Sequence, residues 1–275
     1  MKRVSSASMS QPELPKRALS DILEGGAKLA ARHILVLLRV TATLILPVSV
    51  AFFAAFVWLA SDSGSRHLAI GILVPAAVIY ALTSVLAGAA CMKAAYEASG
   101  GARPSARAAI EFVFGRLGPV LCLGTLLAVG ATPAIALPVV PGVTVLGNYA
   151  PFLLALAIVS LWFSGTFSVA MPAMLVEQKG IADSLRRSAQ LVRGSFWRAL
   201  GTVVLGGILA LFAGTIVAIV VSFFSYGGGN VTRIVTLVGL ALGELFVAPL
   251  FAAFLVVLYR DLRARDKGSN VERAS

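Results

Sequence analysis

The chain has 275 residues, of which 59% are hydrophobic and only 13% are charged, and its formal net charge is +11. An ordinary globular domain has roughly 25% charged residues, so this composition excludes a typical water-soluble protein. The positive charge falls in short polar segments between long apolar ones, which favours a membrane surface over a nucleic acid as its partner.

Six membrane spans are predicted between a polar tail over residues 1–16 and a second tail over residues 264–275, so the membrane domain covers residues 17–263. A span needs about 20 apolar residues in helical form. Four separate stretches meet this condition, over residues 40–60, 68–92, 199–226 and 234–259. Residues 117–176 contain no Asp, Glu, Lys, Arg or His, and we expect two further spans there, joined by a turn over residues 138–142.

The distribution of Lys and Arg predicts the orientation of these spans. Of the 23 basic residues, 21 lie before span 1, after span 6 and in the segments after spans 2 and 4, and the three opposite loops share only Arg66 and Arg233. Positive charge in short loops resists translocation across the membrane. We therefore expect a multi-pass protein of the bacterial cytoplasmic (inner) membrane with both termini in the cytoplasm.

A polar-to-amphipathic segment precedes each odd-numbered span and opens near a serine, at Ser20, Ser105 and Ser184. These segments predict interfacial helices on the cytoplasmic side. A threefold repeat of one helix-plus-hairpin unit would produce the pattern, and so would alternating hydropathy alone. The expected fold class is therefore an all-α polytopic membrane protein with six transmembrane helices and amphipathic interfacial helices.

The third of these segments has the clearest helical periodicity. Ile181, Leu185 and Val192 recur on one face, and arginines recur on the other. Such a helix would lie in the headgroup plane, with Ser184 or Asp183 capping its first turn. The segment and the start of the next span supply four candidate contacts to anionic headgroups, Arg186, Arg187, Arg193 and Arg198. An anchor that orients span 5 would show the same pattern.

Small residues and one acid stand out within the spans. Gly206, Ala210 and Gly214 in span 5, and Gly239 and Gly243 in span 6, have a spacing that allows helix backbones to approach closely. Glu244 is an ionisable residue inside span 6, where such a group is expensive and usually faces other helices or water. It predicts either a proton or cation relay or a structural acid bonded to Thr215, Ser164 or water.

Two passages resemble a known family. Residues 172–206 read PAMLVEQKGIADSLRRSAQLVRGSFWRALGTVVLG, and residues from 249 onward read PLFAAFLVVLYRDLRARDKGSN. Both are similar to the bacterial family called the glycerophosphoryl diester phosphodiesterase membrane domain. The residues that carry the resemblance most clearly are Glu177, Gly180, Ser184, Gly194, Trp197, Tyr259, Asp261 and Arg263.

The resemblance implies a membrane module, because the family's catalytic chemistry resides in a separate domain with His, Glu and metal-binding acids. The chain has only two histidines, His33 and His67. A metal-assisted phosphodiesterase needs several carboxylates and a histidine close together. We therefore expect no catalytic residue, cofactor or metal site.

The resulting functional prediction is a non-enzymatic module that scaffolds or regulates partners at the lipid headgroup surface. Its expected partners are anionic membrane lipids and a membrane or cytoplasmic protein, with no nucleic acid. The alternative is a transporter or lipid-handling protein that uses Glu244.

Overall fold

The computed structural model describes residues 18–61, 66–139, 150–223 and 229–274. Within these ranges the chain is helical and contains no strand. The helices are α1 (Leu19–Ser61), α2 (Arg66–Ser99), α3 (Ala106–Phe114), α4 (Leu117–Val139), α5 (Ala150–Phe167), α6 (Ala170–Glu177), α7 (Ile181–Val192), α8 (Phe196–Phe223) and α9 (Gly229–Ala274). The predicted fold class, a polytopic helical membrane protein, is confirmed.

The described helices contain five segments long and apolar enough to cross a membrane, and up to six when a bent pair counts as one span. The five lie in α1, α2, α5 with α6, α8 and α9, and the bent pair is α3 with α4, which meet at 90°. The upper count equals the six spans expected. The expected turn over residues 138–142 begins at the end of α4 and otherwise lies outside the described residues, as does the tail over residues 1–16.

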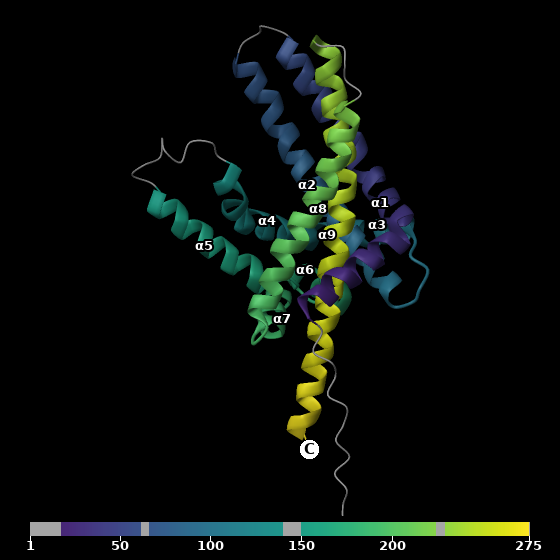
Figure 1. The fold of residues 1–275 in the computed structure, drawn as a ribbon, viewed down its shortest axis with the longest axis vertical. Helices are drawn as coiled ribbons and strands as arrows, with labels where there is room; N and C mark the ends of the chain where they lie inside the picture. Colours follow the sequence, from purple (N-terminus) through teal and green to yellow (C-terminus); the bar gives the residue numbers. More distant parts are fainter. Residues whose placement is uncertain (1–17, 62–65, 140–149, 224–228, 275) are drawn as a thin grey trace, which may run out of the picture.

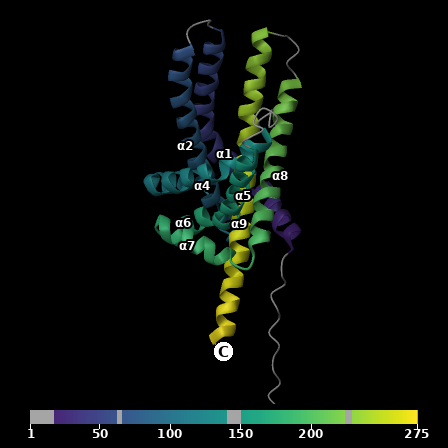
Figure 2. The same ribbon diagram turned by 90° about the vertical axis from the view of Figure 1, so that its left-hand side faces the viewer.

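The long helices form two pairs that stand side by side. Figures 1 and 2 show α1 beside α2 and α8 beside α9, while α5 leans away from the other long helices. The beginning of α1 and the end of α9 both lie toward the lower end of Figure 1. Helix α9 contacts α1, α2 and α8, and it is buried on all sides over residues 252–259.

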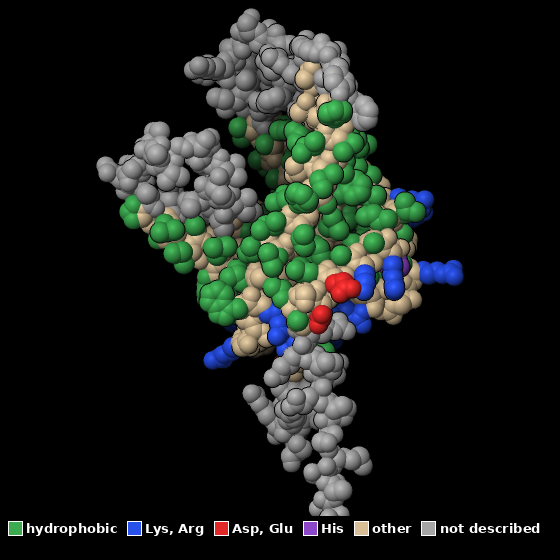
Figure 3. Space-filling model, in the orientation of Figure 1, with side chains coloured by type: hydrophobic (Ala, Val, Ile, Leu, Met, Phe, Trp, Pro, Cys, Tyr) green, Lys and Arg blue, Asp and Glu red, His purple; other side chains and the backbone are tan. Residues whose placement is uncertain are grey.

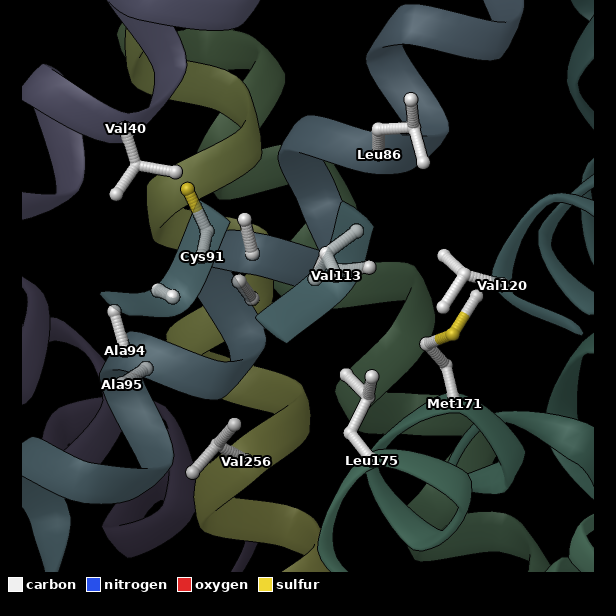
Figure 4. Close-up of a cluster of buried hydrophobic side chains, with 14 of the residues drawn as sticks. Val40, Leu86, Cys91, Ala94, Ala95, Val113, Val120, Met171, Leu175 and Val256 are labelled. Carbon is white, nitrogen blue, oxygen red and sulfur yellow. The ribbon is translucent and has the colours of Figure 1, made fainter. Parts of the chain in front are cut away.

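The core lies where α9 crosses the other helices. Cys91, Ala94 and Ala95 of α2 are buried there together with Val256 of α9, and Figure 4 shows them beside side chains from α1, α3, α4 and α6. Small residues on α2 leave room for these neighbours. Gly26 of α1 has the same role toward α9, because a Cβ at this glycine would lie 3.1 Å from Cα of Phe254. Burial of this apolar surface from six helices stabilises one arrangement of the helix ends.

Charged side chains are concentrated at one end of the molecule. Figure 3 shows Lys, Arg, Asp and Glu mainly in a band across the lower part of the described surface, with a largely hydrophobic surface above it. We call the part of the molecule at this level the charged end. Helices α3, α6 and α7 and the beginning of α1 lie at this level, and α9 runs through it and extends beyond the other helices.

All three segments expected before the odd-numbered spans are helical, and each joins its span differently. In α1 the helix kinks at His33, which has φ −118° and ψ 18°. Helix α3 is followed by the sharp bend into α4 at Gly115. Between α7 and α8 the chain turns at Gly194, whose φ of +89° is a conformation that favours glycine.

The predicted cap of α7 is wrong. The N-cap is Gly180, and no side chain caps the helix; Ser184 lies a full turn inside and its hydroxyl donates to the Gly180 carbonyl at 2.7 Å. Gln178 ends α6 in a left-handed conformation with φ 53°. The chain turns there, and α7 begins at Ile181, before Asp183 and Ser184. Ser105, by contrast, caps α3, because its hydroxyl oxygen accepts from the Ala108 N–H at 3.4 Å.

The inner face of α7 packs on protein. Ser184, Ser188, Leu191 and Val192 are buried, and α7 contacts α5, α6 and α9. The Ser188 hydroxyl donates to the Thr166 carbonyl of α5 at 2.9 Å. Neighbouring helices of the protein therefore occupy this side of α7.

Candidate functional site

The most densely connected polar group at the charged end is centred on Glu177, the last residue of α6. We call it the ion cluster, and it consists of Glu177, Lys179, Arg187, Tyr259 and Asp266. These residues come from the end of α6, the loop after it, α7 and α9. The ion cluster therefore joins two consecutive helices, α6 and α7, to α9, which is distant in the sequence.

Glu177 is the shared acceptor of the ion cluster. The Tyr259 hydroxyl donates to Oε1 at 2.8 Å, and Arg187 Nε lies 3.4 Å from the same oxygen. The second carboxylate oxygen, Oε2, lies 2.7 Å from Lys179 Nζ. Only 11% of the Glu177 side chain is exposed, so these three donors replace much of its hydration.

Arg187 links Glu177 to the last part of α9. Its Nη2 donates to Asp266 Oδ2 at 2.9 Å. Partial burial acts to lower the pKa of Arg187, but the hydrogen bond to Asp266 and the nearby Glu177 carboxylate outweigh it, so the pKa lies above its ordinary value. The guanidinium stays charged and ties α7 to both α6 and α9.

A second group of charges surrounds Asp261 of α9. One carboxylate oxygen, Oδ2, lies 2.9 Å from Arg265 Nε and 3.5 Å from Arg198 Nη1. Asp261 is 8% exposed, which makes it the most buried acid in the described ion pairs. The start of α8 is thereby attached to α9 beside the ion cluster.

The structure separates the four arginines predicted to contact headgroups. Arg186 and Arg193 are exposed, whereas Arg187 and Arg198 are bound to carboxylates of α6 and α9. Arg187 and Arg198 lie on helix faces that point toward α6 and α9. Only Arg186 and Arg193 remain available to a lipid or a partner protein.

The two passages that carry the family resemblance meet in space. Glu177 and Tyr259, separated by 82 positions, form a direct hydrogen bond. Trp197 is 80% exposed at the start of α8, while its neighbour Phe196 packs against Gly165 of α5. Gly180 and Gly194 mark the turns at the two ends of α7.

Three contributors were not anticipated from the sequence. Asp266 and Lys179 belong to the ion cluster, and Tyr96 of α2 accepts from Arg263 Nη1 at 3.3 Å. The Tyr96 ring centroid lies 6.3 Å from that of Tyr259. Charged residues and tyrosines are common at helix ends, so the local sequence did not distinguish Asp266, Lys179 or Tyr96 from their neighbours.

Glu244 lies apart from the ion cluster, in the apolar part of α9. It is half-buried, and Ser84 of α2 donates to its Oε1 at 3.3 Å. The expected partners Thr215 and Ser164 are therefore not the ones found; the Thr215 hydroxyl donates to the Leu211 carbonyl of its own helix at 2.8 Å. Helix α9 presents Glu244 to α2 because that helix packs against it.

Residues 144–270 match the sequence model of the family described as the membrane domain of glycerophosphoryl diester phosphodiesterase. The family resemblance is confirmed over this region. The matched region includes the whole ion cluster and Glu244, while Tyr96 and Ser84 lie before it. A search of curated proteins and a search of solved structures each found no match.

The match concerns the membrane domain of that family. Among the described residues of this chain, no group of three or more His, Cys, Asp or Glu side chains is arranged to hold a metal ion. The geometry of the ion cluster is that of a structural joint: each carboxylate is held by basic or hydroxyl groups of neighbouring helices.

Proposed function

We propose that the protein is a non-catalytic module of the bacterial inner membrane that scaffolds or regulates a partner protein at the headgroup surface. One observation carries the proposal. The ion cluster attaches α7 to α6 and α9, while Arg186 and Arg193 of the same helix remain exposed. A basic surface held in one orientation suits recognition of an anionic partner.

The proposed orientation places the charged end in the cytoplasm. It is supported by the 21 basic residues expected on that side against two on the other. It is also supported by the beginning of α1 and the end of α9, which lie toward the charged end. Anionic lipids of the cytoplasmic leaflet attract each nearby Lys or Arg by about 1 kcal/mol, so the same residues would hold α7 at the membrane surface.

A photo-crosslinking amino acid at Gln190 tests the proposal in cells. Gln190 is exposed on α7, near Arg186 and Arg193. We expect one discrete protein adduct, lost when Arg186 and Arg193 are both changed to Glu at unchanged membrane abundance. The control is the same cross-linker at Phe212, a 65% exposed position in the apolar part of α8, which should label lipid.

The three possible results of the cross-linking experiment have distinct meanings. Loss of the adduct together with loss of function in a deletion strain would support partner recruitment by α7. An adduct from Gln190 that persists in the double Glu variant would reject the exposed arginines as its basis. The absence of any protein adduct from Gln190 would reject recruitment by α7 altogether.

A transporter or lipid-handling protein is the second candidate, favoured by the contact between Glu244 and Ser84. A carboxyl group and a hydroxyl group from two different helices meet in the apolar part of the molecule. Intramembrane acids mark ion or proton pathways in many transporters. The Gln variant of Glu244, described in the Discussion, separates the two candidates.

A further inference from the structure

A groove of about 380 Å³ opens at the charged end, between the beginning of α4 and the loop that joins α6 to α7. Its size is within the range of roughly 300–1,000 Å³ that is usual for small-molecule sites. Eight residues line it, namely Arg116, Pro119, Met174, Leu175, Gln178, Lys179, Gly180 and Ile181. None of these is one of the four arginines predicted from the sequence to contact headgroups, Arg186, Arg187, Arg193 and Arg198.

The polar rim of the groove carries two positive charges. Arg116 Nη2 donates to Gln178 Oε1 at 3.0 Å, and its guanidinium lies 5.5 Å from the centre of the Phe112 ring. Both partners are neutral, and within the described part of the chain no carboxylate pairs with Arg116. Lys179 pairs with Glu177 but is 40% exposed, so it retains donors for a ligand.

The floor of the groove is apolar. Met174 and Leu175 are almost completely buried beneath it, and Pro119 and Ile181 complete the lining. A ligand that fits this combination has a negatively charged head and an apolar body. A phospholipid has this structure, whereas a free inorganic anion would leave the apolar floor unused.

The position of the groove agrees with a lipid as well. Helices α5 and α6 together form one candidate membrane span, and α6 is its end. Helix α4 packs against α5 and forms the other half of this hairpin. The groove therefore lies where the candidate spans meet the charged end, which the proposed function places at the level of the lipid headgroups. Helix α7 begins at the lining residue Ile181, and α4 begins directly after the lining residue Arg116. Helix N-termini favour an anion, although the Asp183 carboxylate in the first turn of α7 opposes it.

We propose that this groove binds one anionic phospholipid, with its phosphate at Arg116 and Lys179 and the glycerol end of its acyl chains against Pro119, Met174 and Ile181. The inference builds on the proposed position of the charged end at the headgroup level. It adds a defined lipid site that is separate from the exposed face of α7. The bound lipid would fill the space between α4 and α7 and hold the hairpin of α4 and α5 against α6.

Native mass spectrometry of the full chain, purified in mild detergent and mixed with phosphatidylglycerol or phosphatidylcholine, tests this site. We expect the wild type to retain one phosphatidylglycerol in preference to phosphatidylcholine. The Arg116→Gln, Lys179→Gln double variant should bind it on the order of tenfold more weakly, because two phosphate contacts are lost. A second variant, Gly180→Leu, should also weaken binding, because Gly180 lines the groove and the nearest atom to a Cβ there is Asp183 Oδ2 at 4.0 Å, which leaves room for a side chain that competes with the lipid.

The matched control removes two charges elsewhere on the protein. Arg32 and Arg103 are exposed and belong to no ion pair within the described chain, so the Arg32→Gln, Arg103→Gln variant should retain the lipid. Equal loss in this control would overturn the proposal in favour of diffuse charge attraction. Equal retention of both lipids by the wild type would overturn it as well.

Thermal unfolding with inorganic phosphate distinguishes a lipid from a free anion. Short-chain phosphatidylglycerol should raise the unfolding temperature of the wild type, and the same concentration of phosphate should not. An equal shift with phosphate would assign the groove to a free anion and overturn the lipid site. Failure of the lipid site would leave the Gln190 cross-link unaffected, so the two proposals are separable.

Discussion

Glu177 shows how one carboxylate can hold three elements together. It accepts from Tyr259 of α9, contacts Arg187 of α7 and terminates α6. When one partner of such a pair is removed, the other partner stays in a half-buried site without water or a bonding partner. The loss of folding free energy therefore depends on which group is left unpaired.

Tyr259→Phe should lower the stability of the protein in detergent. The change removes a hydrogen bond to a charged acceptor, worth about 1.5–3 kcal/mol, and leaves the ring in its buried position. Thermal unfolding monitored by tryptophan fluorescence measures the effect, with Arg186→Gln on the exposed side of α7 as control. An unfolding temperature equal to that of the wild type would show that the Tyr259 hydroxyl is not bonded in the folded protein.

Glu244 is the second informative residue, because its two interpretations predict different results. Replacement by Gln keeps an acceptor for Ser84 and should leave the unfolding temperature unchanged or slightly raised. Replacement by Leu removes the acceptor and should cost about 1–3 kcal/mol, less if Ser84 turns to its own helix backbone. Ser84→Ala in the Leu background should recover part of this loss.

The activity of the Glu244→Gln variant then decides between the two candidate functions. Complementation of a deletion strain, normalised to membrane abundance, is the measurement. Full activity is expected for a scaffold, because the structural hydrogen bond survives. Loss of activity at normal abundance would favour the transporter, since Gln carries no proton or charge.

At the scale of elements, α8 and α9 pack closely through small residues. The expected packing of small residues is confirmed: Gly206, Ala210 and Gly214 are buried on α8, and Gly239 and Gly243 are buried on α9. A Cβ on Gly214 would lie 2.7 Å from the Gly243 carbonyl oxygen, and one on Gly239 would lie 2.9 Å from the Ala218 carbonyl oxygen. Without side chains at these positions, the two backbones approach closely.

Gly214→Ala should therefore destabilise the protein by about 1–3 kcal/mol, because the helices must separate to admit the methyl group. The matched control is Gly207→Ala on the same helix, where the nearest atom is Phe251 Cε2 at 3.8 Å, an ordinary contact. This control should be neutral or stabilising, since alanine favours a helix more than glycine does. Thermal unfolding of both variants tests the contact, and equal effects would refute the close approach.

The whole molecule separates a charged end from an apolar body, and this division predicts topology. Reporter fusions at Gly64, Pro141 and Gly228 should be active outside the cytoplasm, and those at Gly101, Gly180 and Ser275 inside it. The physical reason is the resistance of Lys and Arg in short loops to translocation, with 21 such residues expected on one side and two on the other. One reproducible reversal would require a different number of spans.

Local properties of the chain were sufficient to predict much of this molecule. Apolar length, charge distribution and glycine spacing predicted the helical membrane fold, the upper count of six spans and close backbone packing at the small residues of α8 and α9. Each of these depends on residues close together in the sequence. The motifs around Glu177 and Tyr259 similarly predicted the family whose model matches residues 144–270.

Only the tertiary structure decided which side chains meet. It bonded Glu177 to Tyr259 and Glu244 to Ser84, and it divided the arginines of α7 and α8 into exposed and paired ones. It also brought Arg116 and Lys179 to one groove. Helical periodicity defines the faces of each helix but not how that helix is rotated or placed against its neighbours, and contacts between distant elements depend on both.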